Sequence, residues 1–570
     1  MKASDYIVDF FIKKGIDTAF VMTGGAIAHV IDSVAAREKE IEYVCVQNEQ
    51  VAAMAAEAYS RTGKANGVAL VTSGPGATNL ITGIVGAWYD CIPAIYITGQ
   101  VRTWEMTTGK STLQDGFQEV DICTQVKNVT KYAKTITNKS DIPLELEKAY
   151  SAANSGRKGP VLIDLPMDIQ VAELTSEEIN SVKDHDFLLD QKYEITKEID
   201  SFIKLYDKSK KPLILIGGGV KHADIKSYFN EFILNSKIPC VSTYAAYEIL
   251  EHSNEYNIGV IGQFGQYSSN GAIQECDLLI ALGTRFGIRA IGNNPDLFAS
   301  NAKVVHVNID SGELKDSRKQ AELSIHSDIF TFLTQIDGKV KCSNESWLHS
   351  LAESKTKDLD ISDKGTGKDV NPYWLVENLN KESSPDCIII PDVGWQVTTL
   401  NQQSKLKFGQ QMFSSWANSP MGYAVAAGIG AHFSNKQKEI IIHIGDGGLQ
   451  LNLQDLQTVS HYEIPLKIFL WNNYGYATIQ AFQDGSLDQR YHATDLNHGY
   501  SAPDFEELAK LYKLQYFRVD DDSEVKNTIS NVLGASGPVL CEVIMDINFR
   551  PKPALGAEKA FDGLEPTLEK

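Results

Sequence analysis

Near-continuous apolar runs recur along the chain, and most of them end in Gly, Asp or Asn. The runs are AFVMTGG, GVALVTSGPG, PAIYITGQ and PVLIDLP in the first third, PLILIGGG, DLLIALGTRF and KVVHVNID in the middle, and CIIIPDVG, EIIIHIGDGG, LKIFLWNN and PVLCEVIMD in the last. Such runs are typical of parallel strands that are buried on both faces. Because helix-like stretches separate them, the pattern predicts an α/β fold with doubly wound, mainly parallel sheets.

Two polar stretches, 171–200 and 353–371, carry no core pattern and are interpreted as linkers. They divide the chain into three predicted α/β domains and a C-terminal tail, namely 1–170, 190–345, 370–550 and 551–570. In parallel sheets, ligands bind at the carboxyl ends of the strands. The Gly, Asp and Asn residues that close the runs are therefore the first candidates for function.

The net charge of the chain limits the classes of partner that it is expected to bind. The chain has 73 acidic and 53 basic residues, a formal net charge of -20 and a mean hydropathy of -0.20. Nucleic acids and anionic membranes are disfavoured, because binding them requires clustered Lys and Arg. No window has the roughly 18 consecutive apolar residues of a spanning helix, and the N-terminal stretch predicts a first helix rather than a secretory signal. These features are typical of a cytoplasmic enzyme that acts on small molecules.

The glycine clusters do not match the common nucleotide-binding fingerprints. In IGGGVKH, IGDGGLQ and GPGATN, the third glycine of GxGxxG is replaced by His222, Gln450 and Asn79. No GxxxxGK[ST] motif is present. The sequence therefore disfavours a nicotinamide dehydrogenase and a P-loop NTPase.

One glycine cluster indicates a metal site. Asp446 follows the run EIIIHIG and opens a predicted helix, and the next strand ends in Asn472-Asn473, with 26 residues between Asp446 and Asn473. Gly475 follows, where a backbone carbonyl can approach. Carboxylate, amide, carbonyl, water and phosphate oxygens form the octahedron that Mg²⁺ prefers. Each motif alone also fits a tight turn, but the pair predicts a magnesium ion that holds a diphosphate beside Gly447 and Gly448.

This spacing of GDGG and NN resembles the signature of thiamine diphosphate enzymes. The stretch QNEQVAAMAAEAYSRTGKANGVALVTSGPGATNLITGIVGAWYDCIPAIYITGQ, the GTRF segment and PDFEELAK extend the resemblance over residues 1–550. The chain is identified as a member of the acetohydroxyacid (acetolactate) synthase-like family, in which the branched-chain-sugar synthases form one subgroup. The resemblance implies pyrimidine-binding, central and diphosphate-binding modules.

The activity implied by the resemblance is decarboxylation of a 2-oxo acid, pyruvate above all. The two-carbon unit is then added to an acceptor carbonyl, either a second 2-oxo acid or a nucleotide-linked keto-sugar. Two alternatives stay open. One is a simple 2-oxo acid decarboxylase or oxidase on the same scaffold, and the other is a non-catalytic binding protein.

The family's catalytic residues map onto this chain by motif. Glu49 matches the glutamate that exchanges a proton with the cofactor's aminopyrimidine, and we expect burial to raise its pKa. Glu57 is the runner-up, and a structural role for Glu49 at a helix N-terminus is the alternative. Phe117 and Gln118 match a pair that reaches the reacting carbon. Cofactor contacts are implied for Asn79, Gly394, Gln396, Met421 and Gly422.

Departures from the family bear on the acceptor and on FAD. Phe482 stands where a Trp selects the acceptor, and Met167 replaces a common Lys. Arg285 and Arg289 remain in RFGIR, although both acidic residues of that element are gone, and Arg289 could hold an acceptor carboxylate or a cofactor phosphate. The family's central domain holds FAD where Gly217, Gly218 and Arg285 lie, although that glycine run also fits a strand–helix turn. A homodimer or homotetramer with sites shared between chains is also implied.

Overall fold

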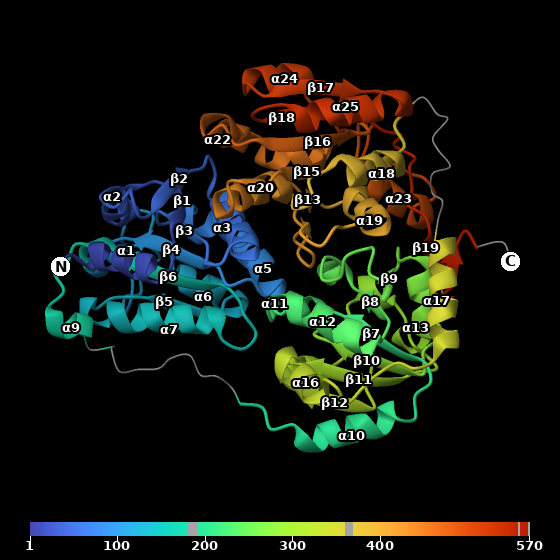
Figure 1. Cartoon of the computed structure of the whole chain (residues 1–570). Coiled ribbons are helices and arrows are strands. Elements are labelled where there is room, and N and C mark those ends of the chain that lie inside the picture. The colour runs from blue at the N-terminus through green and yellow to red at the C-terminus, as the bar shows by residue number, and fades with distance from the viewer. Residues whose placement is uncertain (181, 183–191, 359–368, 557–558, 568–570) are drawn as a thin grey trace.

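The computed structural model describes residues 1–570 except 181, 183–191, 359–368, 557–558 and 568–570. Three lobes are visible in Figure 1, and each is built around a six-stranded parallel sheet with helices packed against it. The predicted α/β class with three doubly wound units is confirmed.

The N-terminal lobe carries its sheet in the order β2-β1-β3-β4-β6-β5. Its strands are β1 (Thr18–Met22), β2 (Glu42–Cys45), β3 (Val68–Val71), β4 (Ile95–Gln100), β5 (Tyr132–Thr135) and β6 (Val161–Pro166). Its helices are α1 (Ala3–Lys13), α2 (Ala28–Ala35), α3 (Glu49–Thr62), α4 (Pro75–Asn79), α5 (Ile81–Tyr89), α6 (Ile122–Val126), α7 (Ile142–Asn154), α8 (Met167–Gln170) and α9 (Ser176–Asn180). The four inner strands β1, β3, β4 and β6 are almost wholly buried, as their apolar runs predict.

The central lobe has the strand order β12-β11-β10-β7-β8-β9. Its strands are β7 (Pro212–Ile216), β8 (Cys240–Ser242), β9 (Asn257–Val260), β10 (Leu278–Leu282), β11 (Lys303–Asn308) and β12 (Leu323–His326). Its helices are α10 (Thr196–Tyr206), α11 (Gly218–His222), α12 (Lys226–Ser236), α13 (Tyr267–Glu275), α14 (Ile288–Ile291), α15 (Ser311–Lys315), α16 (Ile329–Ile336) and α17 (Glu345–Lys357).

The C-terminal lobe has the strand order β14-β13-β15-β16-β18-β17. Its strands are β13 (Ile388–Pro391), β14 (Gln411–Met412), β15 (Ile440–Gly445), β16 (Leu466–Asn472), β17 (Gln515–Val519) and β18 (Val539–Ile544). Its helices are α18 (Pro372–Glu382), α19 (Trp395–Gln403), α20 (Tyr423–Ser434), α21 (Asp446–Leu449), α22 (Leu456–His461), α23 (Ala477–Ser486), α24 (Phe505–Leu511) and α25 (Asp522–Gly534).

The segments interpreted as linkers contain more structure than their composition indicates. Helix α9 lies inside 171–200 and α10 begins in it at Thr196, while residues 181 and 183–191 of that stretch lie outside the described residues. Helix α17 begins at the predicted boundary of 345 and buries Trp347 and Leu351 in the central core. The part of the second linker at 359–368 also lies outside the described residues.

The C-terminal tail is an integral part of the fold. Phe561 is buried in the core of the central lobe and packs edge-on against Phe298, with ring centroids 4.8 Å apart. Strands β19 (Ala554–Leu555) and β20 (Leu564–Glu565) form a small antiparallel ladder, and Gln402 of α19 donates a hydrogen bond to the Pro553 carbonyl. The tail therefore joins the C-terminal lobe to the central one (Figure 1).

A buried polar network ties the N-terminal lobe to the C-terminal lobe, where α3 packs against α20. Glu57 of α3 is 1% exposed and forms an ion pair with Arg61, which also pairs with Asp90. The Tyr423 hydroxyl of α20 donates to the second oxygen of Glu57. Burial raises the pKa of Glu57, against the opposing effects of Arg61 and Tyr423. These groups satisfy one another, which is what a charge buried between two lobes requires.

Candidate active site

Asp446 and Asn473 lie at the carboxyl ends of the adjacent strands β15 and β16, which pair in parallel with Gly445 opposite Trp471. Asp446 is 2% exposed, and its Oδ2 accepts hydrogen bonds from the Gly475 amide at 3.1 Å and the Tyr500 hydroxyl at 2.6 Å. Asn473 Oδ1 is buried without a hydrogen-bond partner. A buried oxygen without a hydrogen-bond partner, close to a buried carboxylate, is the kind of ligand pair that a cation satisfies. The predicted ligands Asp446, Asn473 and Gly475 are therefore brought together.

Tyr500 is a member of this site that the sequence interpretation missed. It follows Asp446 by 54 residues, and its ring lies edge-on to Tyr476 with centroids 4.9 Å apart. Burial raises the pKa of Asp446 to about 6, while the Tyr500 hydroxyl and the amides of Gly447 and Gly475 favour the charged form. The Tyr500 hydroxyl donates a hydrogen bond to Oδ2 and so orients the Asp446 carboxylate. Hydrogen-bond partners just outside a coordination sphere orient metal ligands in this way. No spacing signal connects these two residues in the sequence.

The helix predicted to begin at Asp446 is broken. Helix α21 ends at Leu449, a 3₁₀ segment occupies Gln450–Asp455, and α22 begins at Leu456. The break is at Asn452, which has φ -128° and ψ 32°. Its side chain donates to the Gly422 carbonyl at 2.9 Å and accepts from the Gln50 amide at 3.2 Å. The helical pattern fails here because the Asn452 side chain bonds to Gly422 of its own lobe and to Gln50 of the N-terminal lobe.

The loop between β13 and α19 contains Gly394 and Gln396. Gly394 has φ 124°, a conformation that favours glycine, and a Cβ placed on it would lie 2.4 Å from the side-chain oxygen of Gln396. The Gln396 amide in turn approaches Gly445, so this loop borders the strand end that carries Asp446. The predicted diphosphate contacts Gly394, Gln396, Gly447 and Gly448 thus surround one site.

Asp392 determines where Met421 and Gly422 lie. Its carboxylate is wholly buried and accepts hydrogen bonds from the amides of Gly422 at 2.9 Å and Ala424 at 3.3 Å, at the start of α20. Burial raises the pKa of Asp392 to about 7, and these amides oppose the rise. Gly422 adopts the left-handed conformation with φ 80°, and Met421 before it is half-buried. The sequence interpretation quoted the PDVG motif but used only its glycine.

Glu49 is the first residue of α3, and it is half-buried rather than buried as we expected. Its carboxylate accepts a hydrogen bond from the Asn79 side chain at 2.9 Å, so two predicted cofactor contacts lie together. The runner-up Glu57 is buried, but its two oxygens are taken by Arg61 and Tyr423. Of the two glutamates, only Glu49 has a carboxylate accessible to a ligand.

Phe117 and Gln118 lie on the segment between β4 and α6. The Phe117 side chain is 86% exposed. Gln118 has φ 63°, rare for a residue with a side chain, and it packs against Gly74 of the GPGATN loop. Within the described ranges, no hydrogen bond connects Glu49, Phe117 or Gln118 to the strand ends of the C-terminal lobe. Phe482 on α23 is also well exposed, at 63%.

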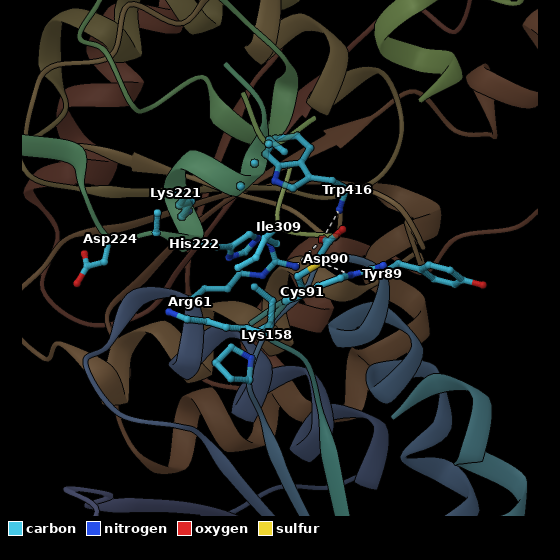
Figure 2. Close-up of a pocket in the computed structure, with 18 of the residues that line it drawn as sticks. Arg61, Tyr89, Asp90, Cys91, Lys158, Lys221, His222, Asp224, Ile309 and Trp416 are labelled. Atoms are coloured by element: carbon cyan, nitrogen blue, oxygen red, sulfur yellow. Dashed lines mark hydrogen bonds and ion pairs between the residues drawn. The ribbon is translucent and has the colours of Figure 1, made fainter. Parts of the chain in front are cut away.

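A cavity of about 1580 Å³ lies where the three lobes meet. Figure 2 shows Arg61, Asp90 and Trp416 together at its wall, where Asp90 accepts a hydrogen bond from the Trp416 amide at 2.8 Å. Its charged lining is mixed, with eight basic side chains, including Arg157, Lys158, Lys221, Arg285 and Arg289, and six acidic ones. Gly218, one of the two glycines expected at FAD, lines the cavity, whereas Gly217 is buried against Gly283.

The described residues contain no group of three or more His, Cys, Asp and Glu that could bind a metal. The predicted magnesium site needs only one carboxylate, since the other protein ligands are amide and backbone oxygens. None of the described helices has the length and apolar character needed to cross a membrane.

The models of three thiamine pyrophosphate enzyme domains match the chain. The N-terminal thiamine pyrophosphate binding domain matches residues 1–124, the central domain 199–336 and the C-terminal thiamine pyrophosphate binding domain 392–543. Together with the strand-end site, these matches define a thiamine diphosphate-dependent enzyme.

Similar proteins of known name indicate which group of thiamine diphosphate enzymes the chain belongs to. The acetolactate synthase large subunit of Cyanidium caldarium is 33% identical over 97% of this chain and 95% of its own length. The acetolactate synthase large subunit of Lactococcus lactis is 31% identical over 97% of this chain and 94% of its own length. The isozyme 2 large subunit of Escherichia coli is 31% identical over 96% of this chain and 96% of its own length. The chain therefore belongs to the acetolactate synthase-like family of thiamine diphosphate enzymes, as its motifs predict.

Proposed function

We propose that this protein decarboxylates pyruvate and joins the resulting two-carbon unit to an acceptor carbonyl, with thiamine diphosphate and Mg²⁺ as cofactors. The observation that carries the proposal is the pairing of buried Asp446 with the unsatisfied Asn473 Oδ1 at adjacent strand ends. Bound thiamine diphosphate supplies an acidic carbon that adds to the 2-oxo acid. Asp446, Asn473 and the Gly475 carbonyl would hold the magnesium ion.

The protein's own side chains have separate tasks in this proposal. Glu49 exchanges a proton with the aminopyrimidine, and Asn79 orients its carboxylate. Asp392 fixes the start of α20, where Met421 and Gly422 would support the cofactor. Gly394 and Gln396 border the diphosphate. Phe117 and Gln118 reach the reacting carbon from the N-terminal lobe.

The acceptor is proposed to bind among Phe117, Gln118 and Phe482. Phe482 is smaller than Trp and is exposed on α23, which leaves space for an acceptor larger than pyruvate. Both a second 2-oxo acid and a nucleotide-linked keto-sugar are compatible with this opening, and the product assay below separates them.

We expect pyruvate to be consumed in the presence of thiamine diphosphate and Mg²⁺, with a product that contains a new carbon–carbon bond. Product analysis by NMR, with pyruvate alone and with added keto-sugar nucleotide or aldehyde, measures this. Acetolactate from pyruvate alone would identify a 2-oxo acid acceptor, and a branched product only with the added carbonyl would identify that acceptor. Acetaldehyde or an acyl product alone would favour the simple decarboxylase or oxidase. Pyruvate left intact would favour a non-catalytic protein.

The cavity between the lobes is proposed to hold FAD, with no net redox role. Its size and the eight lysine and arginine side chains in its lining fit a large anionic dinucleotide. Arg285 and Arg289 lie at its rim and would contact the phosphates, and Gly218 allows a close backbone approach. Flavin bands in the visible spectrum of the purified protein would support this assignment.

The active site is proposed to be shared between two chains of a homodimer or a dimer of dimers. The support is the separation of the two halves of the site, with Glu49, Phe117 and Gln118 on the N-terminal lobe and Asp446 and Asn473 on the C-terminal lobe. The strong exposure of Phe117 also favours a partner that covers it. In a two-fold dimer each such contact occurs twice.

Mixing two inactive variants tests the shared site. After dissociation and reassociation of Glu49→Gln with Asp446→Ala, a hybrid dimer would contain one doubly defective site and one intact site. Activity should return to at most about one quarter of wild type for random pairing. Each variant reassociated with itself is the control. No recovery despite demonstrated subunit exchange would place each site within a single chain.

A further inference from the structure

Asp164 is a buried carboxylate that the proposed chemistry does not use. It lies on β6, opposite Thr98 of β4 and Thr135 of β5, and is 1% exposed. Three side chains donate hydrogen bonds to it, namely Thr98 at 2.7 Å, Thr135 at 3.0 Å and Gln100 at 3.1 Å. Burial raises the pKa of Asp164 to about 7, while these donors favour the charged form. No ion pair reaches it from any described residue, so the donors alone compensate its burial.

Gln100 connects this carboxylate to the segment that carries Phe117 and Gln118. Its side-chain amide donates to Asp164 and also to the Val120 carbonyl at 2.7 Å, and its oxygen accepts from the Val101 amide at 3.0 Å. Both donors and the acceptor of the side-chain amide are therefore used. The segment leaves the sheet at Val101 and returns at Val120, so one buried side chain holds both of its ends.

Asp164 and the backbone groups of Val101 and Val120 together set the orientation of that amide. Rotating the Gln100 amide by half a turn would point its oxygen at the Asp164 carboxylate and at the Val120 carbonyl, both of which are acceptors. It would also point the NH₂ group at the Val101 amide, which is a donor. Only the observed orientation of the amide satisfies all three of its partners. It is therefore strongly favoured, because buried polar atoms without partners are costly.

The interior of the segment is held separately by Glu119. Its carboxylate accepts hydrogen bonds from the amide and hydroxyl of Thr107 and from the amides of Asp115 and Gly116. Although burial opposes ionisation, these donors hold the pKa of Glu119 below its usual value. The tip of the segment is therefore folded on itself. The folded unit attaches to the rest of the lobe through Gln100 at its two ends and through Thr103, whose amide and hydroxyl donate to Asp168 of α8 at 2.9 and 2.6 Å.

We propose that Asp164 and Gln100 are positioning residues for the carboligation reaction, which hold Phe117 and Gln118 at the reacting carbon by fastening both ends of segment 101–120. The inference rests on the proposed function, in which these two side chains reach that carbon. Neither Asp164 nor Gln100 contacts a reactant. They act through the backbone at Val101 and Val120, and a displacement of about 1 Å at a reacting group can cost roughly 100-fold in rate.

Gln100→Met tests the positioning role, because Met keeps the length of the side chain and removes all three hydrogen bonds. We expect kcat for carboligation to fall about 10- to 100-fold, with the affinity for thiamine diphosphate changed by less than about threefold. Gln170→Met is the matched control. Gln170 is also buried in the N-terminal lobe and donates two hydrogen bonds to backbone carbonyls, but those of Ala26 and Leu165. Equal kcat values for the two variants would overturn the proposal.

A double-mutant cycle separates positioning from general destabilisation. If Gln100 acts only through Phe117 and Gln118, then Gln100→Met should cost little further activity in a Phe117→Ala/Gln118→Ala background. An undiminished further loss would mean that Gln100 stabilises the lobe as a whole, and it would overturn the proposal. Wild-type turnover by Phe117→Ala/Gln118→Ala would also overturn it, because that result removes the role of the pair while leaving the carboligase assignment intact.

Limited proteolysis, which does not depend on enzyme activity, tests whether Gln100 holds segment 101–120 against the N-terminal lobe. Lys110 is exposed on this segment, and limited trypsin digestion after it reports how firmly the segment is held. We expect faster cutting at this site in the full-length Gln100→Met protein than in Gln170→Met at equal thermal stability. Equal rates of cutting would show that Gln100 does not hold the segment, whatever the kinetics.

Discussion

Glu49→Gln is expected to lower turnover by roughly 10²–10⁴-fold, the usual loss when a general acid–base is removed. Gln keeps the volume of the side chain and its hydrogen bond to Asn79, but it cannot release and recover a proton. The affinity for thiamine diphosphate should stay within about tenfold, since the diphosphate and its metal are held at the other lobe. Steady-state kinetics and a cofactor titration measure the two effects.

Glu42→Gln is the matched control for this variant. Glu42 lies on β2 in the same lobe and pairs with Lys436 at the surface, away from Asn79. Its replacement should leave turnover unchanged, because surface ion pairs contribute little. Near wild-type turnover in Glu49→Gln would reject the assignment of the proton-exchanging group.

Asp446→Ala is expected to abolish Mg²⁺-dependent binding of thiamine diphosphate. Without the carboxylate, the diphosphate of the cofactor would face a protein of formal net charge -20 with no cation to bridge them. Calorimetric titration of the variant with thiamine diphosphate, with and without Mg²⁺, measures the loss. The Tyr500 hydroxyl and the Gly475 amide also lose their acceptor, so thermal unfolding must confirm that the variant is folded.

Asp520→Ala, an exposed aspartate of the same lobe that pairs with Arg518, is the control and should bind the cofactor normally. Asp446→Asn should bind more weakly than wild type but better than Asp446→Ala, because the amide oxygen still coordinates without the charge. Unchanged cofactor affinity in a folded Asp446→Ala protein would contradict the metal bridge.

The pairing of Asp446 with Asn473 could be predicted from the sequence because each residue directly follows an apolar strand. In a parallel sheet such residues meet at one edge when their strands are neighbours, as β15 and β16 are. The placement of Glu49 beside Asn79 was not predicted, although both were candidates. Their contact depends on how α3 and α4 pack, and local sequence does not encode that packing.

The supporting residues were the least predictable part of the site. Tyr500, Asp392 and Asn452 form hydrogen bonds with groups 30 or more residues away in the chain, which the local patterns around them do not reveal. Asn452 also breaks a helix that its neighbours favour, since its bonds to Gly422 and Gln50 replace local ones. Several of the strands that the pattern did not single out, such as β5, β12 and β17, lie at sheet edges and are half exposed.

The sequence by itself determined the three α/β units, all of their inner strands except β8, and the family, because these depend on burial patterns and on motif spacings along neighbouring strands. It also predicted which carboxylate and amide would bind a metal. The tertiary structure alone decided that Glu57 is taken by Arg61 and Tyr423 while Glu49 is accessible. It alone placed Gln100 between Asp164 and the ends of segment 101–120. These outcomes depend on which distant groups satisfy one another once they are buried, and no local pattern records that choice.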